Sequence, residues 1–370
     1  MFRRLLFAAA AALGVLPVLV ATAALPETNA VLSGSAFIKS IQDADGSYGT
    51  TDLGQNVDAV FAVRASGYDP AKDLVGGNGP VQFLNAKVAG VGSPAAAAKA
   101  ALGARALGMD PKAIAGIDLI ARVNQGYDAA KGTYGGDDFS QSVAMLGLAC
   151  TGNTVPPAAV AALKSTQLAA GGGWGFGGFA DPDTTAIALQ ALLASGTPKT
   201  DSAITKAFAY LKSSQGNDGG WGFDPSESNA SSTAYVIQAL IALGENPDAA
   251  GYERGGVTPV QFLVSQQQPN GSFKGFDAAY ATNQALPALA GRTFCNAPDS
   301  PVTRTRPAAA ATPAPSPSAT PVASQTAAPK PPSTGTGERS KSAGRVPAIS
   351  GLAVLCAGAA ALSAGRWRRR

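Results

Sequence analysis

The chain has 370 residues, of which 46% are hydrophobic and 14% charged, with 3 cysteines and no histidine. The absence of histidine excludes Ser-His-Asp and Cys-His catalysis and His-containing zinc sites, and three cysteines cannot build a four-thiolate centre. Residues 31–300 carry 16 Lys and Arg against 22 Asp and Glu, so this block has a net charge of −6 although the whole chain has +4. An acidic block with basic ends lacks the basic face that nucleic-acid binding needs, and we expect no nucleic-acid partner.

The first 23 residues have the pattern of a secretory signal peptide. Arg3 and Arg4 precede an apolar run from Leu5 to Val20, and Ala21-Thr22-Ala23 offers a cleavage site with small residues. An uncleaved membrane anchor is the alternative. We therefore predict residues 1–23 to be a signal peptide and the protein to be exported to an extracytoplasmic space, where cysteines can pair.

Between residues 31 and 298 one pattern recurs about every 40–50 residues. In its clearest copy a helical run ends at Gln215, a glycine-rich turn follows with Trp221 six positions later, and a second helical run begins near Ser232. Other copies have Gln42 with Tyr48, Gln167 with Trp174, and Gln267 with Phe273, and a looser copy has Gln125 with Tyr134. A further unit, the second in the chain, keeps only its two helical runs, near 81–88 and 94–108.

Each half of a unit predicts a helix, because apolar residues recur at three- and four-residue steps. Glycines stand just past the second helix, where a left-handed C-cap is needed: Gly67, Gly108, Gly152, Gly196 and Gly244. We expect the aromatic side chain of the turn to fold back on the helix ends and the glutamine to bond backbone groups left free there. Six units predict an all-α protein, an (α/α)6 toroid of six helix-pair repeats over residues 31–298, with an open solenoid as the alternative.

The C-terminal part carries a linker and an anchor. Residues 299–345 are rich in Pro, Ala, Ser and Thr, which predicts a disordered stalk. Residues 346–364 are uncharged and long enough to span a bilayer as a transmembrane helix, and the basic tail 365–370 would stay in the cytoplasm. The layout also resembles a sortase sorting signal, with Pro331-Pro332-Ser333-Thr334-Gly335 in place of Leu-Pro-x-Thr-Gly. We expect the body to be anchored to the cell membrane, or to the cell wall, by its C-terminus.

The run from Gln215 to Phe223 resembles the repeat motif of squalene and terpene cyclases and protein prenyltransferases. These proteins share an (α/α)6 toroid, and the resemblance covers residues 31–298. It implies the fold but no single function, because the fold hosts unrelated activities. The prenyltransferase zinc site contains His, which this chain lacks, so we predict no metal.

One segment resembles a catalytic motif. Asp181-Pro182-Asp183-Thr184-Thr185-Ala186 is similar to the Asp-x-Asp-Asp-Thr-Ala motif of class II terpene cyclases, whose middle Asp protonates an alkene or epoxide. The resemblance places Asp183 on that proton donor, with Asp181 beside it and Thr184 in place of the last Asp. Such an acid has to be unusually strong. The competing interpretation is a helix cap, because the next unit has Asn229-Ala230-Ser231-Ser232 at the same place.

A second resemblance points to binding. The segments Ser142–Cys150 and Thr282–Phe294 resemble the α-domain of transcobalamin and intrinsic factor, which holds cobalamin between this domain and a smaller β-rich domain. We predict no cofactor, and the resemblance makes a corrinoid a candidate ligand. We also expect Cys150 and Cys295 to pair, because both lie near helix C-termini on the exported side.

The starts of the inner helices ring one mouth of a toroid, so polar residues there are candidate ligand contacts. The candidates are Asp58, Asp138, Gln141, Asp183, Tyr280, Asn283 and Gln284, together with Ser231 and Asp277. Capping is the competing role for most of them. Because few aromatic residues are free of the turns, we expect a shallow polar funnel.

Our first interpretation is a non-catalytic surface protein that binds a small molecule, corrinoid or isoprenoid-like, or a protein partner. One alternative is a terpene or squalene cyclase-like enzyme with Asp183 as its proton donor. The other is a purely adhesive or structural surface module.

Overall fold

The computed structural model describes residues 25–224 and 227–305. The expected signal peptide (1–23), transmembrane helix (346–364) and basic tail (365–370) lie outside these residues, as does most of the expected linker. None of the helices within the described ranges has the length and apolar character needed to cross a bilayer.

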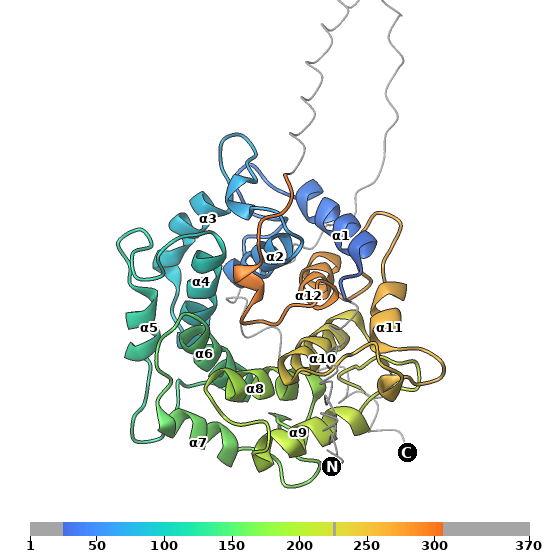
Figure 1. Ribbon diagram of the computed structural model, residues 1–370. Helices are drawn as coiled ribbons and strands as arrows, with labels where there is room; N and C mark the ends of the chain where they lie inside the picture. Colours follow the sequence, from blue (N-terminus) through green and yellow to red (C-terminus); the bar gives the residue numbers. More distant parts are fainter. Residues whose placement is uncertain (1–24, 225–226, 306–370) are drawn as a thin grey trace, which may run out of the picture. The chain divides into compact units, whose positions relative to one another are not determined.

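The described residues form two concentric rings of α-helices (Figure 1). The inner ring consists of α2 (Leu53–Ala65), α4 (Pro94–Ala106), α6 (Asp138–Cys150), α8 (Pro182–Ala194), α10 (Ala230–Leu243) and α12 (Ala278–Leu289). The outer ring consists of α1 (Thr28–Ser40), α3 (Pro80–Lys87), α5 (Leu119–Gln125), α7 (Pro157–Ser165), α9 (Ser202–Ser213) and α11 (Pro259–Ser265). Each inner helix packs against the next, and α12 packs against α2. The ring is therefore a closed α/α toroid, which excludes the open solenoid.

The expectation of a purely helical protein needs one correction. A short antiparallel hairpin precedes α8, formed by β1 (Gly175–Phe176) and β2 (Phe179–Ala180), with Phe176 opposite Phe179. It forms because Gly177 and Gly178 both adopt positive φ values, which suit a two-residue hairpin turn. Single turns of 3-10 helix complete the fold: η1 (Pro70–Lys72), η2 (Val88–Gly90), η3 (Ala250–Tyr252) and η4 (Ala297–Asp299).

A buried aromatic wedge sits in the turn from each outer helix to the next inner helix, except in the second unit. Trp221 is fully buried, and its indole Nε1–H donates to the carbonyl of Leu211 in the last turn of α9 at 2.7 Å. Its backbone N–H donates to the hydroxyl of Thr233 on α10 at 2.9 Å. The same backbone bond to an inner-helix side chain joins Tyr48 to Asn56, Tyr134 to Gln141, Trp174 to Thr185 and Phe273 to Thr282. In these five units the aromatic residue therefore holds the outer helix and the inner helix together.

The glutamine at the end of the outer helix bonds in two directions. Gln215 Nε2 donates to the carbonyl of Gly219 in its own turn and to that of Tyr252 in the following unit. Gln267 makes the equivalent pair, and its second bond, 2.8 Å to the carbonyl of Ala30, joins the last unit to the first. The predicted bonding to free backbone groups is confirmed, and these bonds also tie neighbouring units together around the ring.

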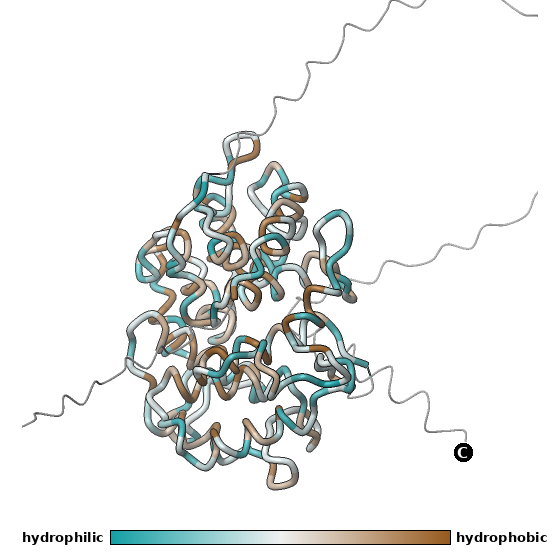
Figure 2. Tube along the Cα trace, turned by 45° about the vertical axis from the view of Figure 1, so that its right-hand side comes forward, coloured by the Kyte–Doolittle hydropathy of each residue, from teal (hydrophilic) through white to brown (hydrophobic). Residues whose placement is uncertain are grey.

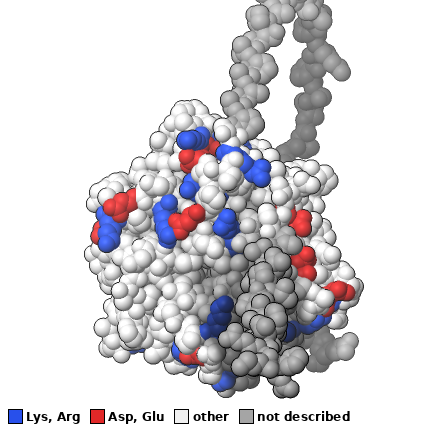
Figure 3. All heavy atoms as spheres, in the orientation of Figure 1, with Lys and Arg blue, Asp and Glu red and all other residues white. Residues whose placement is uncertain are grey.

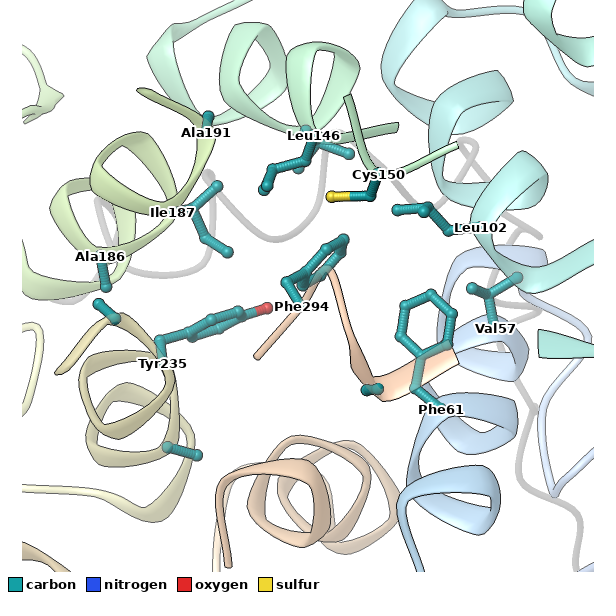
Figure 4. Packing of buried hydrophobic residues seen from close by; sticks show 14 of the residues in the cluster. Val57, Phe61, Leu102, Leu146, Cys150, Ala186, Ile187, Ala191, Tyr235 and Phe294 are labelled. Carbon is teal, nitrogen blue, oxygen red and sulfur yellow. The ribbon is translucent and has the colours of Figure 1, made fainter. Parts of the chain in front are cut away.

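The chain that follows α12 closes the C-terminal end of the inner ring. Phe294 is buried at the centre and meets Phe61 edge to face, with ring centroids 5.5 Å apart (Figure 4). Its backbone N–H donates to Gln190 Oε1 of α8. Next to it, Cys150 at the end of α6 and Cys295 form a disulfide. The C-terminal end of the ring is therefore plugged and cross-linked.

The body extends a few residues into the segment expected to be linker. η4 packs against α2 and α4, and Ser300 is buried. The backbone N–H groups of Thr303 and Arg304 both donate to the carbonyl of Gly67. Residues 299–304 thus contact the toroid, because their backbone groups find acceptors at the end of α2.

The body has its own continuous hydrophobic core. Apolar positions recur along the helical turns, with hydrophilic stretches in the connecting loops (Figure 2). On the face seen in Figure 3, acidic and basic side chains lie in small mixed groups separated by uncharged surface. Because the described residues belong to one compact unit, a fragment spanning 25–305 is expected to fold on its own.

We expect Trp221→Phe to lower the free energy of unfolding of this fragment by about 2–3 kcal/mol, because the variant loses the bond to Leu211 and leaves space in the core. Urea denaturation followed by circular dichroism measures the loss. Phe223→Ser in the same turn is the control, because Phe223 is 52% exposed and its replacement should cost less than about 0.5 kcal/mol. Equal losses in both variants would contradict the structural role of the wedge.

Candidate ligand site at the centre of the inner ring

Side chains from all six inner helices meet near the N-terminal end of the ring. We call this set the central cluster: Asp58 of α2, Lys99 of α4, Phe139 of α6, Asp183 of α8, Tyr235 of α10, and Tyr280 and Gln284 of α12. All lie within the first two turns of their helices. Because α2 and α8 stand on opposite sides of the ring, Asp58 and Asp183 approach one another only across its centre.

An ion pair forms one side of the central cluster. Lys99 Nζ lies 2.7 Å from Asp58 Oδ2, and only 3% of the Asp58 side chain is exposed. Burial raises the pKa of the Asp58 carboxyl, and the charge of Lys99 opposes this shift. A buried pair of this kind costs desolvation energy and adds little net stability, so it supplies polarity at the centre more than it supports the fold.

Two tyrosines and a phenylalanine form the other side. The hydroxyl groups of Tyr235 and Tyr280 lie 3.1 Å apart, and Phe139 meets Tyr235 edge to face with centroids 6.1 Å apart. Burial is the main cause that raises the pKa of both phenols, and the charges of Asp58 and Asp183 add to it. Both phenols therefore stay neutral around pH 7 and offer hydroxyl groups and aromatic surface together.

Asp183 is the least satisfied acid of the central cluster. Its Oδ1 is buried and has no hydrogen-bond partner within the described part of the chain. Burial, and then the charge of Asp181, raise the pKa of its carboxyl to about 7, while the hydroxyl of Ser232 opposes the shift. The interpretation of Asp183 as the helix cap is wrong, because Asp181 is the cap of α8 and accepts from the N–H of Thr184 at 2.8 Å.

Two amides of α12 are also incompletely bonded. Asn283 and Gln284 are both 3% exposed, and Asn283 Oδ1 and Gln284 Nε2 lack partners among the described residues. Asn283 uses only its Nδ2, which donates to the carbonyl of Gln55. Buried polar atoms without partners are uncommon and costly, so they indicate a bound ligand or ordered water at this place.

Three of the predicted contacts have other partners. The side chain of Gln141, on α6, reaches back to the preceding turn, where its Oε1 accepts from the N–H of Tyr134 and its Nε2 donates to the carbonyls of Gly132 and Ala159. Because these bonds occupy both ends of its amide, Gln141 is not part of the central cluster. Asp277 caps α12. Asp138 is partly buried and accepts from the hydroxyl of Thr166. Burial raises the pKa of the Asp138 carboxyl.

Sequence reasoning missed Lys99, Phe139 and Tyr235. The sequence does contain a signal for Lys99, because this single charge interrupts the alanine run 95–101 of an inner helix. Tyr235 and Phe139 have no such signal, since an aromatic residue on an apolar helix is usually part of the core.

Exposed phenylalanines lie on one side of the N-terminal end of the inner ring. Phe176 and Phe179 of the hairpin, Phe223 and Phe276 are between 52% and 95% exposed. They stand in the turns that lead into α8, α10 and α12, at the end where the central cluster lies. A shallow polar funnel was expected, but its rim is aromatic on this side, and exposed apolar groups gathered at one end favour a binding surface. Across the residues described here, no group of three or more Cys, Asp or Glu side chains is arranged to hold a metal ion.

The raised pKa of Asp183 predicts a pH-dependent stability. The folded chain holds the carboxyl proton up to about pH 7, whereas the unfolded chain releases it near 3.8, so stability should fall as the pH rises through this window. Asp183→Asn should be as stable as the wild type at about pH 4 and have a higher Tm at about pH 8. Asn85→Ala, an exposed substitution that changes no ionisable group, is the control whose difference from the wild type should not vary with pH. A constant Tm difference for Asp183→Asn would rule out a buried titrating carboxyl.

Comparison with known proteins identifies relatives of the repeat and the fold. The family model described as the squalene-hopene cyclase C-terminal domain matches residues 137–289. Squalene–hopene cyclase of Zymomonas mobilis subsp. mobilis is 34% identical over 100 residues, which are 24% of this chain and 14% of that enzyme. The chain thus matches only a small part of the length of that relative.

Solved structures share the architecture at low sequence identity. A protein from Actinoplanes superposes with a TM-score of 0.50 and 16% identity, covering 71% of this chain and 98% of that protein. A type II terpene cyclase from Scytonema has a TM-score of 0.48 and 14% identity, covering 71% and 97%. Residues 137–289 are thus similar to the squalene-hopene cyclase C-terminal domain, and the α/α toroid is the fold that the chain shares with the Actinoplanes protein.

Proposed function

We propose that this protein captures an amphiphilic small molecule at the centre of its inner ring and does not transform it chemically. One observation carries the proposal: Asp183 Oδ1 and Gln284 Nε2 in the central cluster, and Asn283 Oδ1 on α12, are buried and have no hydrogen-bond partner within residues 25–224 and 227–305. A ligand with donors and acceptors would satisfy these atoms. Each new hydrogen bond would contribute more binding free energy than one at the surface, because the unpaired atoms are buried.

The chemistry of the central cluster narrows the ligand class. Tyr235, Tyr280 and Lys99 offer donors, the carboxyl and amide oxygens offer acceptors, and the phenylalanine rim offers apolar surface. A corrinoid combines amide groups with a large apolar ring, and an isoprenoid-like molecule combines a polar end with an apolar chain. Both classes fit a polar centre with an aromatic rim.

The place of action forms part of this proposal. A signal peptide at 1–23 and an anchor at 346–364 would hold the toroid outside the cell, on a stalk that begins after residue 304. A ligand-capturing surface protein, in contact with the membrane only through its C-terminal helix, is consistent with that layout. Its partners would be the small molecule or a second surface protein.

We expect the 25–305 fragment to bind cyanocobalamin or geranylgeraniol with a Kd in the micromolar range. Absorbance titration measures the first ligand, and calorimetry measures the second. Asn283→Ala should weaken binding about two- to tenfold, because one hydrogen bond to a neutral group is lost. Asn85→Ala, at an exposed position on an outer helix, is the matched control and should bind like the wild type. Failure of both ligands to bind at millimolar concentration would count against capture of either class.

A second candidate function is proton-initiated cyclisation with Asp183 as the donor. The unpaired Oδ1 and the aromatic faces of Phe139 and Tyr235 favour it, because aromatic faces stabilise cations. The direction of the pKa shift argues against it. Burial and the charge of Asp181 together raise the pKa of this carboxyl to about 7, which makes it a weak acid, whereas protonation of an alkene needs a strong acid.

We expect no cyclic product when the fragment is incubated with squalene, oxidosqualene or geranylgeranyl diphosphate and the extract is examined by gas chromatography and mass spectrometry. Asp183→Asn should give the same result as the wild type. A cyclic product that the wild type forms and Asp183→Asn does not would assign the chain to the cyclases and displace the capture proposal.

A further inference from the structure

A second pocket lies at the opposite end of the toroid from the central cluster. It has a volume of about 160 Å³ and is bounded by the start of α1, the end of α2, and the segment from Ala290 to Arg304 that closes the ring. No feature of the proposed capture site uses this pocket. Its volume is several times that needed for one water molecule, so it has room for a small ion or a group of that size.

The pocket is lined by hydrogen-bond donors that lack acceptors. Ser300 is 1% exposed, and its Oγ has no partner in the part of the chain that the structure describes. The same holds for Arg292 Nε, which is also buried. Arg304 completes the lining. None of the described carboxylates forms an ion pair with Arg292 or Arg304, whereas Arg64 and Arg105 do have such partners. Two guanidinium groups without an ion pair to a described carboxylate, half-buried Arg292 and exposed Arg304, make a positive, donor-rich site beside the buried hydroxyl of Ser300.

The start of α1 adds further donors. Its N-cap residue, Glu27, makes no side-chain capping bond, so the first N–H groups of this 13-residue helix have no side-chain acceptor. Thr28 in the first turn of α1 lines the pocket. The carbonyl of Gly67 at the end of α2, which would repel an anion, already accepts from Thr303 and Arg304. Free hydrogen-bond donors therefore outweigh free acceptors at this pocket, and this favours a negatively charged ligand.

We propose that this pocket binds a small oxyanion of the phosphate class through Arg292, Arg304 and Ser300. The oxyanion is either free in solution or the head group of an anionic lipid, since both present the same oxygens to the site. Binding would also brace the segment that carries Cys295 and Phe294, because Arg292 and Ser300 flank it on both sides. The proposal is independent of what the central cluster binds.

The test uses the 25–305 fragment, inorganic phosphate as the probe, and sodium chloride at matched ionic strength as the blank. Phosphate should raise the Tm of the wild type beyond the blank, and Arg292→Gln should weaken phosphate binding by at least about tenfold in calorimetry. Arg254→Gln, at a guanidinium on the loop before α11, is the matched control and should bind phosphate as the wild type does. Equal binding by Arg292→Gln and the wild type, or no phosphate-specific shift at tens of millimolar, would overturn the proposal.

Ser300→Ala provides a variant that should fold. Because Ser300 Oγ has no partner, removing it should leave the Tm unchanged or higher in phosphate-free buffer, while phosphate binding weakens. A lower Tm without phosphate and unchanged phosphate binding would show that Ser300 serves the fold alone and would contradict the assigned site.

Vesicles distinguish the two sources of the oxyanion. Co-sedimentation with phosphatidic acid vesicles but not phosphatidylcholine vesicles, lost in Arg292→Gln and reduced by inorganic phosphate, supports a lipid head group. Phosphate binding in calorimetry without vesicle binding supports a free oxyanion.

Discussion

The toroid depends on one interaction, the anchoring of an aromatic wedge between two helices. In the fifth unit, Trp221 bonds to the last turn of α9 through its indole and to Thr233 of α10 through its backbone N–H. A residue held at both ends sets the distance and angle between an outer helix and its inner partner. Repetition of that angle around the chain brings α12 against α2, and the bond from Gln267 to Ala30 joins the two ends of the ring.

Closure of the ring gives the molecule two unlike ends. At the C-terminal ends of the inner helices, Phe294 fills the centre and the disulfide between Cys150 and Cys295 holds it in place. At the N-terminal ends, the centre is polar, partly unsatisfied and bordered on one side by phenylalanines. The buried plug at the C-terminal end shields the central cluster from water on that side. This shielding raises the desolvation cost of every unpaired polar atom in the cluster.

The acid at the centre of the fold lies in a segment that resembles a catalytic motif but departs from it at one position. Asp183 stands where the class II cyclase motif has its proton donor, but Thr184 replaces the neighbouring carboxylate of that motif. Desolvation raises the pKa of Asp183, and an uncharged, weakly acidic carboxyl is better suited to hydrogen bonding than to protonating an alkene.

The sequence by itself determined the repeat, the helix pairs, the wedges and the glycine caps, because each depends on residues close together in the chain. Gly67 and Gly244, for example, adopt the positive φ values that their position after a helix requires. Only the tertiary structure decided which side chains face the centre. The meeting of Asp58, Asp183 and Tyr235 depends on helices separated by up to four units, and no local pattern distinguishes a side chain at the centre from one in the core. The same reason explains why the side chain of Gln141, predicted as a ligand contact, bonds to the turn before α6. Ring closure, a property of the whole chain, places each inner helix and so determines the chemistry at the centre.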